Sequence, residues 1–343
     1  MKSMMKRMVI VGCLVVILGF TTGSRDVFGA ESPAEFFKGK TITWIFSGDA
    51  GSPGELISRT IAPFLGKEIG AKVRIEDKGT DEGVNYTYNQ GSKDGLTLCT
   101  KTSDAIIGND ILKAPGVQFE ADKFNFVADV YPAIKMFQVS PKLPYKTVDS
   151  LRKAKGLRAG GTSAKGSIAI SDAVMLEILG LDGKIITGFK GKKDLTLAIA
   201  RGEIDFMVTS DNMAYRDEKD GYVVNLFAVG KKRSIAVPNV PSFADLGLKV
   251  PKAMEAANKF VISGGTAVVL PPGVPHDRVE YLRKVFQTLS NNKELQKAIE
   301  KLTGDQRPFT PGHELQEDMV EMKADKDLAN KLDTIFKKYT AVR

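Results

Sequence analysis

A short loop near the start of the chain has the residue types of an anion-binding site. Residues 47–52, Ser-Gly-Asp-Ala-Gly-Ser, lie between an apolar β-type run and an apolar run with helical spacing. Such a loop can expose backbone N–H groups, and the N-terminus of the following helix carries partial positive charge. The spacing matches neither a P-loop nor a dinucleotide fingerprint. The loop therefore predicts binding of a small carboxylate or similar oxyanion rather than a nucleotide.

Other candidate ligand-binding residues follow predicted strands or lie in turns. Thr102 and Ser103 follow one strand and Ser210 and Asp211 follow another, and ligands of α/β sheets gather at such strand ends. Lys190 precedes Gly191 and is either a turn residue or a cation that reaches a ligand. The ordinary interpretation of each polar residue, as a turn or cap residue, stays open here.

The catalytic inventory is nearly empty. The two histidines, His276 and His313, lie in the C-terminal segment without metal-ligand spacing. The chain has no Gly-x-Ser-x-Gly elbow. A periplasmic enzyme, such as a hydrolase or lyase, is thus the weaker hypothesis, and no metal or cofactor is expected.

Strand-like and helix-like runs alternate along the chain, which predicts an α/β fold of mostly parallel sheets with helices on both faces. The length exceeds one comfortable core, so we expect two domains with a ligand cleft between them. The predicted division places 31–132 and 259–343 in domain 1 and 133–258 in domain 2. The predicted strands are 41–46, 72–76, 96–100, 125–130, 135–139, 157–160, 204–209, 223–229 and 260–270. The predicted helices are 55–69, 83–90, 148–155, 167–179, 193–201, 240–247, 275–291, 293–303 and a run near 331–339.

The first 30 residues have the pattern of a cleaved signal peptide. A basic segment precedes an apolar run, residues 9–20, that is short for a membrane span, and Val27 and Gly29 suit a peptidase site. An uncleaved anchor is the alternative. Cys13 lies too early in the run for a lipidated cysteine, so we expect a periplasmic, unlipidated protein. Cys99 then stays as a buried thiol in a strand.

The chain has 49 basic and 41 acidic residues, a net charge of +8. The charges are mixed along the sequence, and no aromatic-and-basic module of the nucleic-acid type occurs. This distribution indicates solubility with mild attraction for anions. We therefore expect no nucleic-acid partner, and we expect a monomer.

The chain resembles the solute receptors of tripartite tricarboxylate transporters, the Bug family, over almost all of the predicted mature sequence. Each motif alone is weak, and their order and spacing together carry the resemblance. The motifs are Gly51-Ser52-Pro53-Gly54-Glu55 with Arg59, Asp94-Gly95-Leu96-Thr97-Leu98, Phe189-Lys190-Gly191, Gly202-Glu203-Ile204-Asp205-Phe206-Met207, Arg233 with Pro238-Asn239-Val240-Pro241-Ser242, and Leu270-Pro271-Pro272-Gly273-Val274-Pro275.

The resemblance implies a two-domain periplasmic binding protein, type II-like, that captures a small organic acid and delivers it to membrane permease subunits. It also implies that two facing loops hold one ligand carboxylate. Mapped onto this chain, the ligand-binding residues of the two loops are Ser47, Gly48, Asp49, Ala50, Gly51, Ser52, Glu55, Thr162, Ser163, Ala164, Lys165, Gly166 and Ser167. Thr, Ser and Gly before an apolar helical run are also capping residues, so the second loop too precedes a helix N-terminus.

The chain departs from the family pattern at several loop positions. Gly48 stands where an aromatic residue is usual, Glu55 replaces an aspartate, and Asp49 and Lys165 add charges. These differences leave the identity of the acid open. A receptor that presents the acid to a membrane sensor kinase is the alternative function, because its fold and cleft would be the same.

Overall fold

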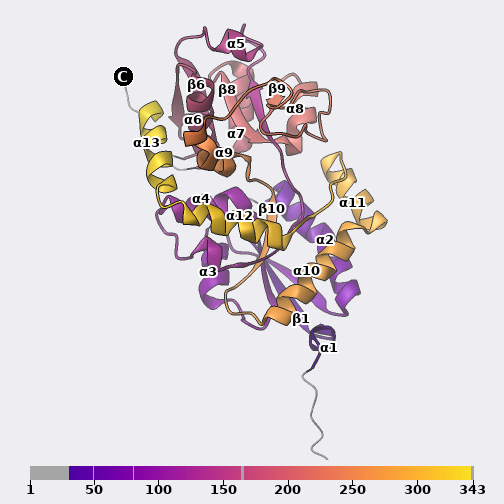
Figure 1. Cartoon of the computed structure of the whole chain (residues 1–343). Coiled ribbons are helices and arrows are strands. Elements are labelled where there is room, and N and C mark those ends of the chain that lie inside the picture. Colours follow the sequence, from indigo (N-terminus) through magenta and orange to yellow (C-terminus); the bar gives the residue numbers. More distant parts are fainter. Residues whose placement is uncertain (1–30, 49, 80, 164–165, 341–343) are drawn as a thin grey trace, which may run out of the picture. The chain divides into compact units, whose positions relative to one another are not determined.

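The computed structural model describes residues 31–48, 50–79, 81–163 and 166–340 (Figure 1). The predicted signal peptide, with Cys13, lies outside these residues, as do Asp49, Ala164 and Lys165 of the two predicted loops. From Pro33 onwards the chain forms one compact unit. None of the described helices is long and apolar enough to cross a membrane.

The first sheet has the strand order β11-β4-β10-β3-β1-β2. Strands β1, β2, β3 and β4 run in one direction, and β10 and β11 run in the other. The parallel part is built from strand–helix–strand units, in which the helix carries the chain back so that the next strand runs in the same direction. The strands are β1 Thr41–Phe46, β2 Lys72–Asp77, β3 Thr97–Thr102, β4 Asn125–Asp129, β10 Thr266–Leu270 and β11 Thr310–Pro311.

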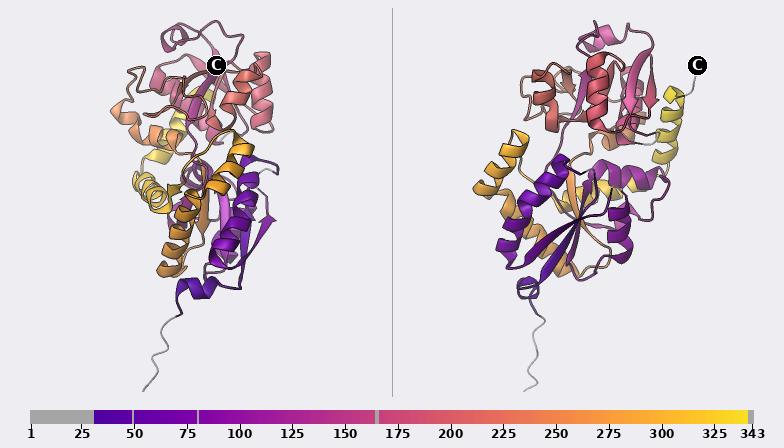
Figure 2. Two further views of the ribbon diagram at one scale, coloured as in Figure 1. Left: turned by 90° about the vertical axis from the view of Figure 1, so that its right-hand side faces the viewer. Right: turned by 180° about the vertical axis from the view of Figure 1, so that it is seen from behind.

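Helices cover both faces of the first sheet (Figure 2). On one face pack α2 Pro53–Ile69, α10 His276–Ser290 and α11 Lys293–Thr303, and on the other α3 Glu82–Gln90, α4 Ser103–Ile111 and α12 Gly312–Ala324. The short helix α1, Pro33–Phe37, packs against α10. The only tryptophan of the chain, Trp44 of β1, is fully buried here and donates its indole N–H to Thr100 Oγ1 at 2.7 Å.

The second sheet has the order β7-β6-β8-β5-β9, and only β5 opposes the direction of its other strands. Its strands are β5 Lys135–Val139, β6 Leu157–Gly161, β7 Gly183–Thr187, β8 Phe206–Ser210 and β9 Val224–Ala228. The accompanying helices are α5 Val148–Leu151, α6 Ser167–Leu179, α7 Lys192–Arg201, α8 Ala214–Lys219, α9 Glu255–Ile262 and α13 Leu328–Thr340, with 3-10 turns η2 Asp211–Met213 and η3 Lys252–Met254. A further 3-10 turn, η1 Ala121–Lys123, precedes β4 of the first sheet and packs against α4 and α12. The predicted α/β class is thus confirmed, with two mixed sheets.

The chain passes between the sheets from β4 to β5 and again from α9 to β10. The C-terminal helix α13 then packs against α6 and β7 of the second sheet, where Lys338 Nζ and Tyr339 Oη meet the Glu177 carboxylate at 2.6 and 2.7 Å. The predicted division assigns this helix to domain 1. The domain boundaries stay a prediction. The contacts of α13 with the second sheet are the feature that the predicted division does not include.

Two predicted elements are wrong. The run 260–270 is not one strand, because residues 260–262 complete α9 and β10 begins at Thr266; apolar residues suit both elements, and periodicity cannot separate them over so short a span. The segment 240–247 forms turns rather than a helix. There Asp245 Oδ2 accepts hydrogen bonds from Ser242 N and Arg233 Nε at 2.8 and 2.7 Å, which fixes a turn in place of helical hydrogen bonds.

Candidate functional site

A small cavity of about 180 Å³ lies where the ends of strands from both sheets meet. The carboxyl ends of β3 and β8 open onto it, and helices α4, α6 and α7 begin beside it. Ligands of α/β proteins gather at such strand ends. The lining residues are Thr102, Asp104, Tyr131, Ala133, Lys135, Ser167, Ile168, Lys192, Thr209, Ser210, Asn212, Gly265 and Thr266.

A buried ion pair joins elements of the two sheets at this cavity. Lys135 Nζ of β5 lies 2.7 Å from Asp104 Oδ2 of α4, and the two side chains are 6% and 7% exposed. Burial raises the pKa of Asp104, but the Lys135 charge and hydrogen bonds from Lys135, Thr102 and Ser167 outweigh burial, so the net pKa is lowered. Asp104 of α4 is therefore an ionised carboxylate, and it is stabilised by the protein's own groups, including Ser167 at the start of α6.

Lys192, the first residue of α7, is the second cation of the cavity. Its Nζ donates to Asn212 Oδ1 at 2.8 Å and to the Ser210 carbonyl at 3.2 Å. Burial lowers its pKa to about 8, which the charges of Asp217 and Asp211 offset in part and that of Lys135 reinforces. Among the described residues, no carboxylate lies within ion-pair distance of this ammonium. The cavity thus offers a largely protonated cation at neutral pH without a carboxylate counter-ion.

The cavity brings together only some of the predicted site residues. Thr102, Ser167 and Ser210 line it. Ser103 is buried beside it, and its backbone N–H donates to the Gly265 carbonyl at 3.3 Å. Lys190 is exposed, and its backbone N–H bonds to Asp194 Oδ2 at 3.1 Å.

Asp211 is fully engaged by protein groups. Its Oδ1 accepts from Arg307 Nη1 at 2.7 Å and from the Ile134 amide at 3.2 Å, and its Oδ2 accepts from Ser234 Oγ at 2.6 Å. Arg307 also bonds Asp305 through both Nε and Nη2. A bidentate arginine between two buried carboxylates fixes geometry strongly. Asp211 therefore braces the junction between the sheets.

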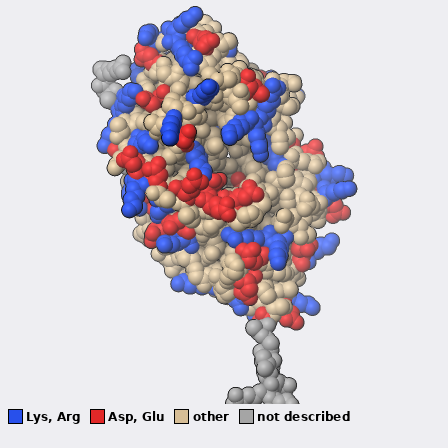
Figure 3. Space-filling model, viewed as in Figure 1, with Lys and Arg blue, Asp and Glu red and all other residues tan. Residues whose placement is uncertain are grey.

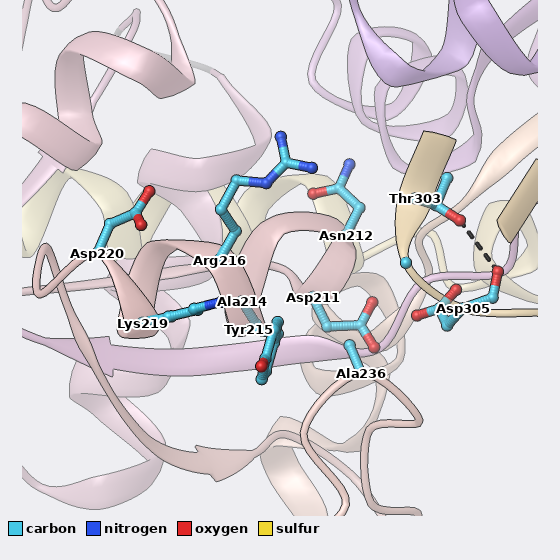
Figure 4. A pocket seen from close by; sticks show the side chains of 11 residues that line it. Asp211, Asn212, Ala214, Tyr215, Arg216, Lys219, Asp220, Ala236, Thr303 and Asp305 are labelled. Atoms are coloured by element: carbon cyan, nitrogen blue, oxygen red, sulfur yellow. Dashed lines mark hydrogen bonds between the residues drawn. The ribbon is translucent and has the colours of Figure 1, made fainter. Parts of the chain in front are cut away.

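A wider cavity of about 410 Å³ adjoins this brace and shares Asn212 with the first cavity (Figure 4). Figure 4 shows Thr303 and Asp305 at one end of the lining and Arg216, Lys219 and Asp220 toward the other, with Asp211 between them. Arg216 and Lys219 of α8 add two cations to its lining. Charged groups of both signs thus line the space next to the small cavity.

The first predicted loop is occupied by its own side chains. Gly51 N–H donates to Glu55 Oε2 at 2.6 Å, and Arg59 pairs with Glu55 Oε1. The Gly51 hydrogen bond, followed by that of Arg59, lowers the pKa of Glu55. A Cβ at residue 48 would lie 2.6 Å from Phe46 Cζ, so the Phe46 ring fits only because residue 48 is glycine.

The remaining residues of the two predicted loops lie as follows. Ser47 is buried, Ser52 is the N-cap of α2, and Ala50 is exposed. In the second loop the Gly166 amide donates to the Ser163 carbonyl at 3.2 Å, and a Cβ at residue 166 would lie 3.2 Å from Thr162 Oγ1. Among the residues of the two loops that the structure describes, Ser167 alone lines the small cavity.

Sequence reasoning missed Lys192, Lys135 and Asp104. Lys192 lies two residues beyond the predicted Lys190, at a helix start that the sequence did indicate. Lys135 opens an otherwise mostly apolar strand, which is the one local signal that it is buried. The described residues hold no cluster of His, Cys, Asp and Glu that could bind a metal. Cys99 is buried as expected, which raises its pKa to about 12.

No family model and no curated protein matches the chain. Solved structures do. A TctC solute-binding protein from Polaromonas has a TM-score of 0.68 at 19% identity and covers 85% of this chain and 98% of its own. MatC from Rhodopseudomonas palustris with bound malate has 0.63 at 18%, covering 87% and 99%. An R. palustris protein with adipate has 0.65 at 16%, covering 87% and 97%.

A periplasmic binding protein named BugD is a further structural neighbour, with a TM-score of 0.60 at 16% identity, covering 88% and 97%. At such low identity a likeness in structure shows the fold. The chain therefore has the fold of the TctC solute-binding protein and of the periplasmic binding protein BugD.

Proposed function

We propose that this protein is a periplasmic solute-binding protein of the tripartite tricarboxylate type. It captures a small organic carboxylate in the cavity between the two sheets and passes it to membrane permease subunits. The observation that carries the proposal is Lys192, a cation without a carboxylate partner among the described residues, in a cavity at the strand ends. The neighbours with malate and adipate support the same ligand class.

The groups around Lys192 suit one carboxylate. Two of the three ammonium N–H groups bond Asn212 and Ser210, which leaves the third for a charge-assisted hydrogen bond to the ligand. The hydroxyls of Ser210 and Thr102 are held by Asn212 Oδ1 and Asp104 and fix the surroundings of the ammonium. The N-termini of α6 and α7 add partial positive charge. A volume of about 180 Å³ favours an acid of few heavy atoms. The other cation among the described lining residues, Lys135, is already paired with Asp104, so the site suits a single carboxylate.

Export and mechanism complete the proposal. The first 30 residues act as a signal peptide that is cleaved on export. The mature protein works as a monomer that closes on its ligand by a hinge motion. It releases the ligand chemically unchanged. The passages of chain from β4 to β5, from α9 to β10 and from α12 to α13 are the natural hinges. In the closed state the loops 47–52 and 162–166 contact the ligand through groups other than the backbone amides of Ser47, Gly51 and Gly166, which protein oxygen atoms already hold.

Thermal shift with a panel of di- and monocarboxylates tests the proposal, because a ligand that binds only the folded state raises the melting temperature. Lys192→Met should weaken binding of the active acid about 10–100-fold, the value of one charge-assisted hydrogen bond. Affinity should also fall above pH 8, as the ammonium loses its proton. Lys193→Met, at the exposed neighbouring lysine, is the matched control.

Two outcomes would reject this assignment. One is a panel in which no acid shifts the melting temperature. The other is an acid that binds Lys192→Met and wild type equally well.

A further inference from the structure

A wide groove lies beside β9, separate from the proposed ligand site. It has a volume of about 850 Å³ and lies among the turn after β9, the segment 243–250 and helix α9. Small-molecule sites commonly have volumes of this order. The groove shares only Ala133 and Lys135 with the small cavity, and the Lys135 ammonium is held on the other side by Asp104.

The floor of the groove is apolar and partly open to solvent. It includes Val229, Phe243, Leu248, Val250 and Ile262. Ile262 is 40% exposed and adds accessible apolar surface to this floor. Covering a concave apolar surface of this kind with an apolar ligand lowers the free energy, because it removes that surface from water.

The rim of the groove is positively charged. Lys231, Lys232 and Lys249 are exposed, and none has a carboxylate within ion-pair distance among the described residues. The single acid of the lining is Glu255. Lys259 is the exception among the rim lysines, because it pairs with Asp318 at 3.0 Å and with Glu321 on the acidic face of α12 (Figure 3).

We propose that this groove binds an amphipathic organic anion. The carboxylate or sulfonate head lies among Lys231, Lys232 and Lys249, and the apolar body covers Phe243, Val250 and Ile262. The argument is charge complementarity above an apolar floor: a neutral lipid leaves the lysines unused, and a short polar acid leaves the floor uncovered. The proposal is independent of the function proposed above.

Titration with 1-anilinonaphthalene-8-sulfonate, an amphipathic anion whose fluorescence rises in apolar sites, tests this proposal on the purified protein. Decanoate should displace the probe, and decanol should do so at least about tenfold less well, because it lacks the charge that the lysines attract. The double variant Lys231→Gln/Lys232→Gln should weaken probe and decanoate binding at least about fivefold.

The matched control is Lys297→Gln/Lys301→Gln, which removes the same charge from exposed lysines of α11. It should bind the probe as the wild type does. Ile262→Ser should weaken decanoate more than hexanoate, because the longer chain covers more of the floor. Unfolding midpoints of all variants establish that they are folded.

Three results would overturn the proposal. Equal weakening in the rim variant and the control would show nonspecific attraction. Displacement of the probe by the acid that binds near Lys192, or loss of probe binding in Lys192→Met, would place the probe in the other cavity. A dimer that the rim variant dissociates would assign the groove to a second copy of the chain.

Discussion

Replacing Lys135 by methionine should lower the free energy of unfolding by about 3–5 kcal/mol at pH 7, the cost of leaving one member of a buried ion pair without its partner. Methionine keeps the length and most of the packing of the lysine stem, so the loss of unfolding free energy reports the removed positive charge. The Asp104 carboxylate keeps its hydrogen bonds from Thr102 and Ser167, which places the expected value at the lower end of this range.

The pH dependence gives the prediction its sharper form. In the wild type the pKa of Asp104 is lowered, so its contribution to stability is present above about pH 4 and is lost as pH falls through the folded-state pKa. In Lys135→Met, burial without a counter-ion raises that pKa above the unfolded value. The variant should therefore lose stability as pH rises from 4 to 7 because Asp104 ionises without a counter-ion. In the wild type Asp104 causes no such loss over this pH range.

Urea unfolding at pH 5 and pH 7 measures both effects, with the double variant Lys135→Met/Asp104→Asn as the test of mechanism. The double variant should be more stable at pH 7 than Lys135→Met alone, because no uncompensated charge is then buried. Lys155→Met is the control: its 3.7 Å pair with Asp182 is 82% and 36% exposed, and its loss should cost at most about 1 kcal/mol. A Lys135→Met protein within 1 kcal/mol of the wild type at pH 7, or one whose stability does not depend on pH in the manner described, would refute the reasoning.

Three further predictions follow from other residues. Glu55→Gln should cost about 1–2 kcal/mol in unfolding free energy, because the amide keeps only one acceptor oxygen: one of the two charged hydrogen bonds, from the Gly51 amide or the Arg59 guanidinium, is lost and the other becomes neutral; equal stability at pH 7 would contradict this. Burial raises the pKa of Asp129 to about 7, so the folded state binds the proton more tightly and stability falls as pH rises from 4 to 7; Asp129→Asn should lack that fall, and an unchanged pH profile would disprove the assignment. Mass spectrometry of exported protein should find the N-terminus at Ala30 or Glu31, whereas lipid-modified Cys13 would exclude this cleavage.

Local signals explain how much of the fold could be predicted. The strand–loop–helix units around residues 47–52 and 162–166 follow from apolar periodicity and helix-start residues, which act over a few neighbours in sequence. The same signals cannot show what fills a loop. The resemblance assigns Glu55 to the ligand site, whereas in the structure its carboxylate accepts the amide of Gly51.

The centre of the candidate site depends on contacts between distant parts of the sequence. Lys135 lies on β5 of the second sheet and Asp104 on helix α4, which packs on the first sheet, and in the sequence each resembles an ordinary solvated charge. Lys192 is one lysine in a Lys-Gly-Lys-Lys run, and only tertiary packing distinguishes it from its neighbours. Burial of a charge is therefore the property that sequence patterns conceal here.

The position of Trp44 determines what optical experiments on this protein report. The side chain is buried in the core between the first sheet and the α2–α10 face, with the Phe286 ring edge-on at a centroid distance of 5.9 Å. Intrinsic tryptophan fluorescence therefore follows the first sheet alone, and the second sheet contributes to backbone circular dichroism without a tryptophan of its own. Coincident transitions by the two methods would demonstrate that both sheets unfold together, and an earlier dichroism transition would identify the second sheet as the less stable half.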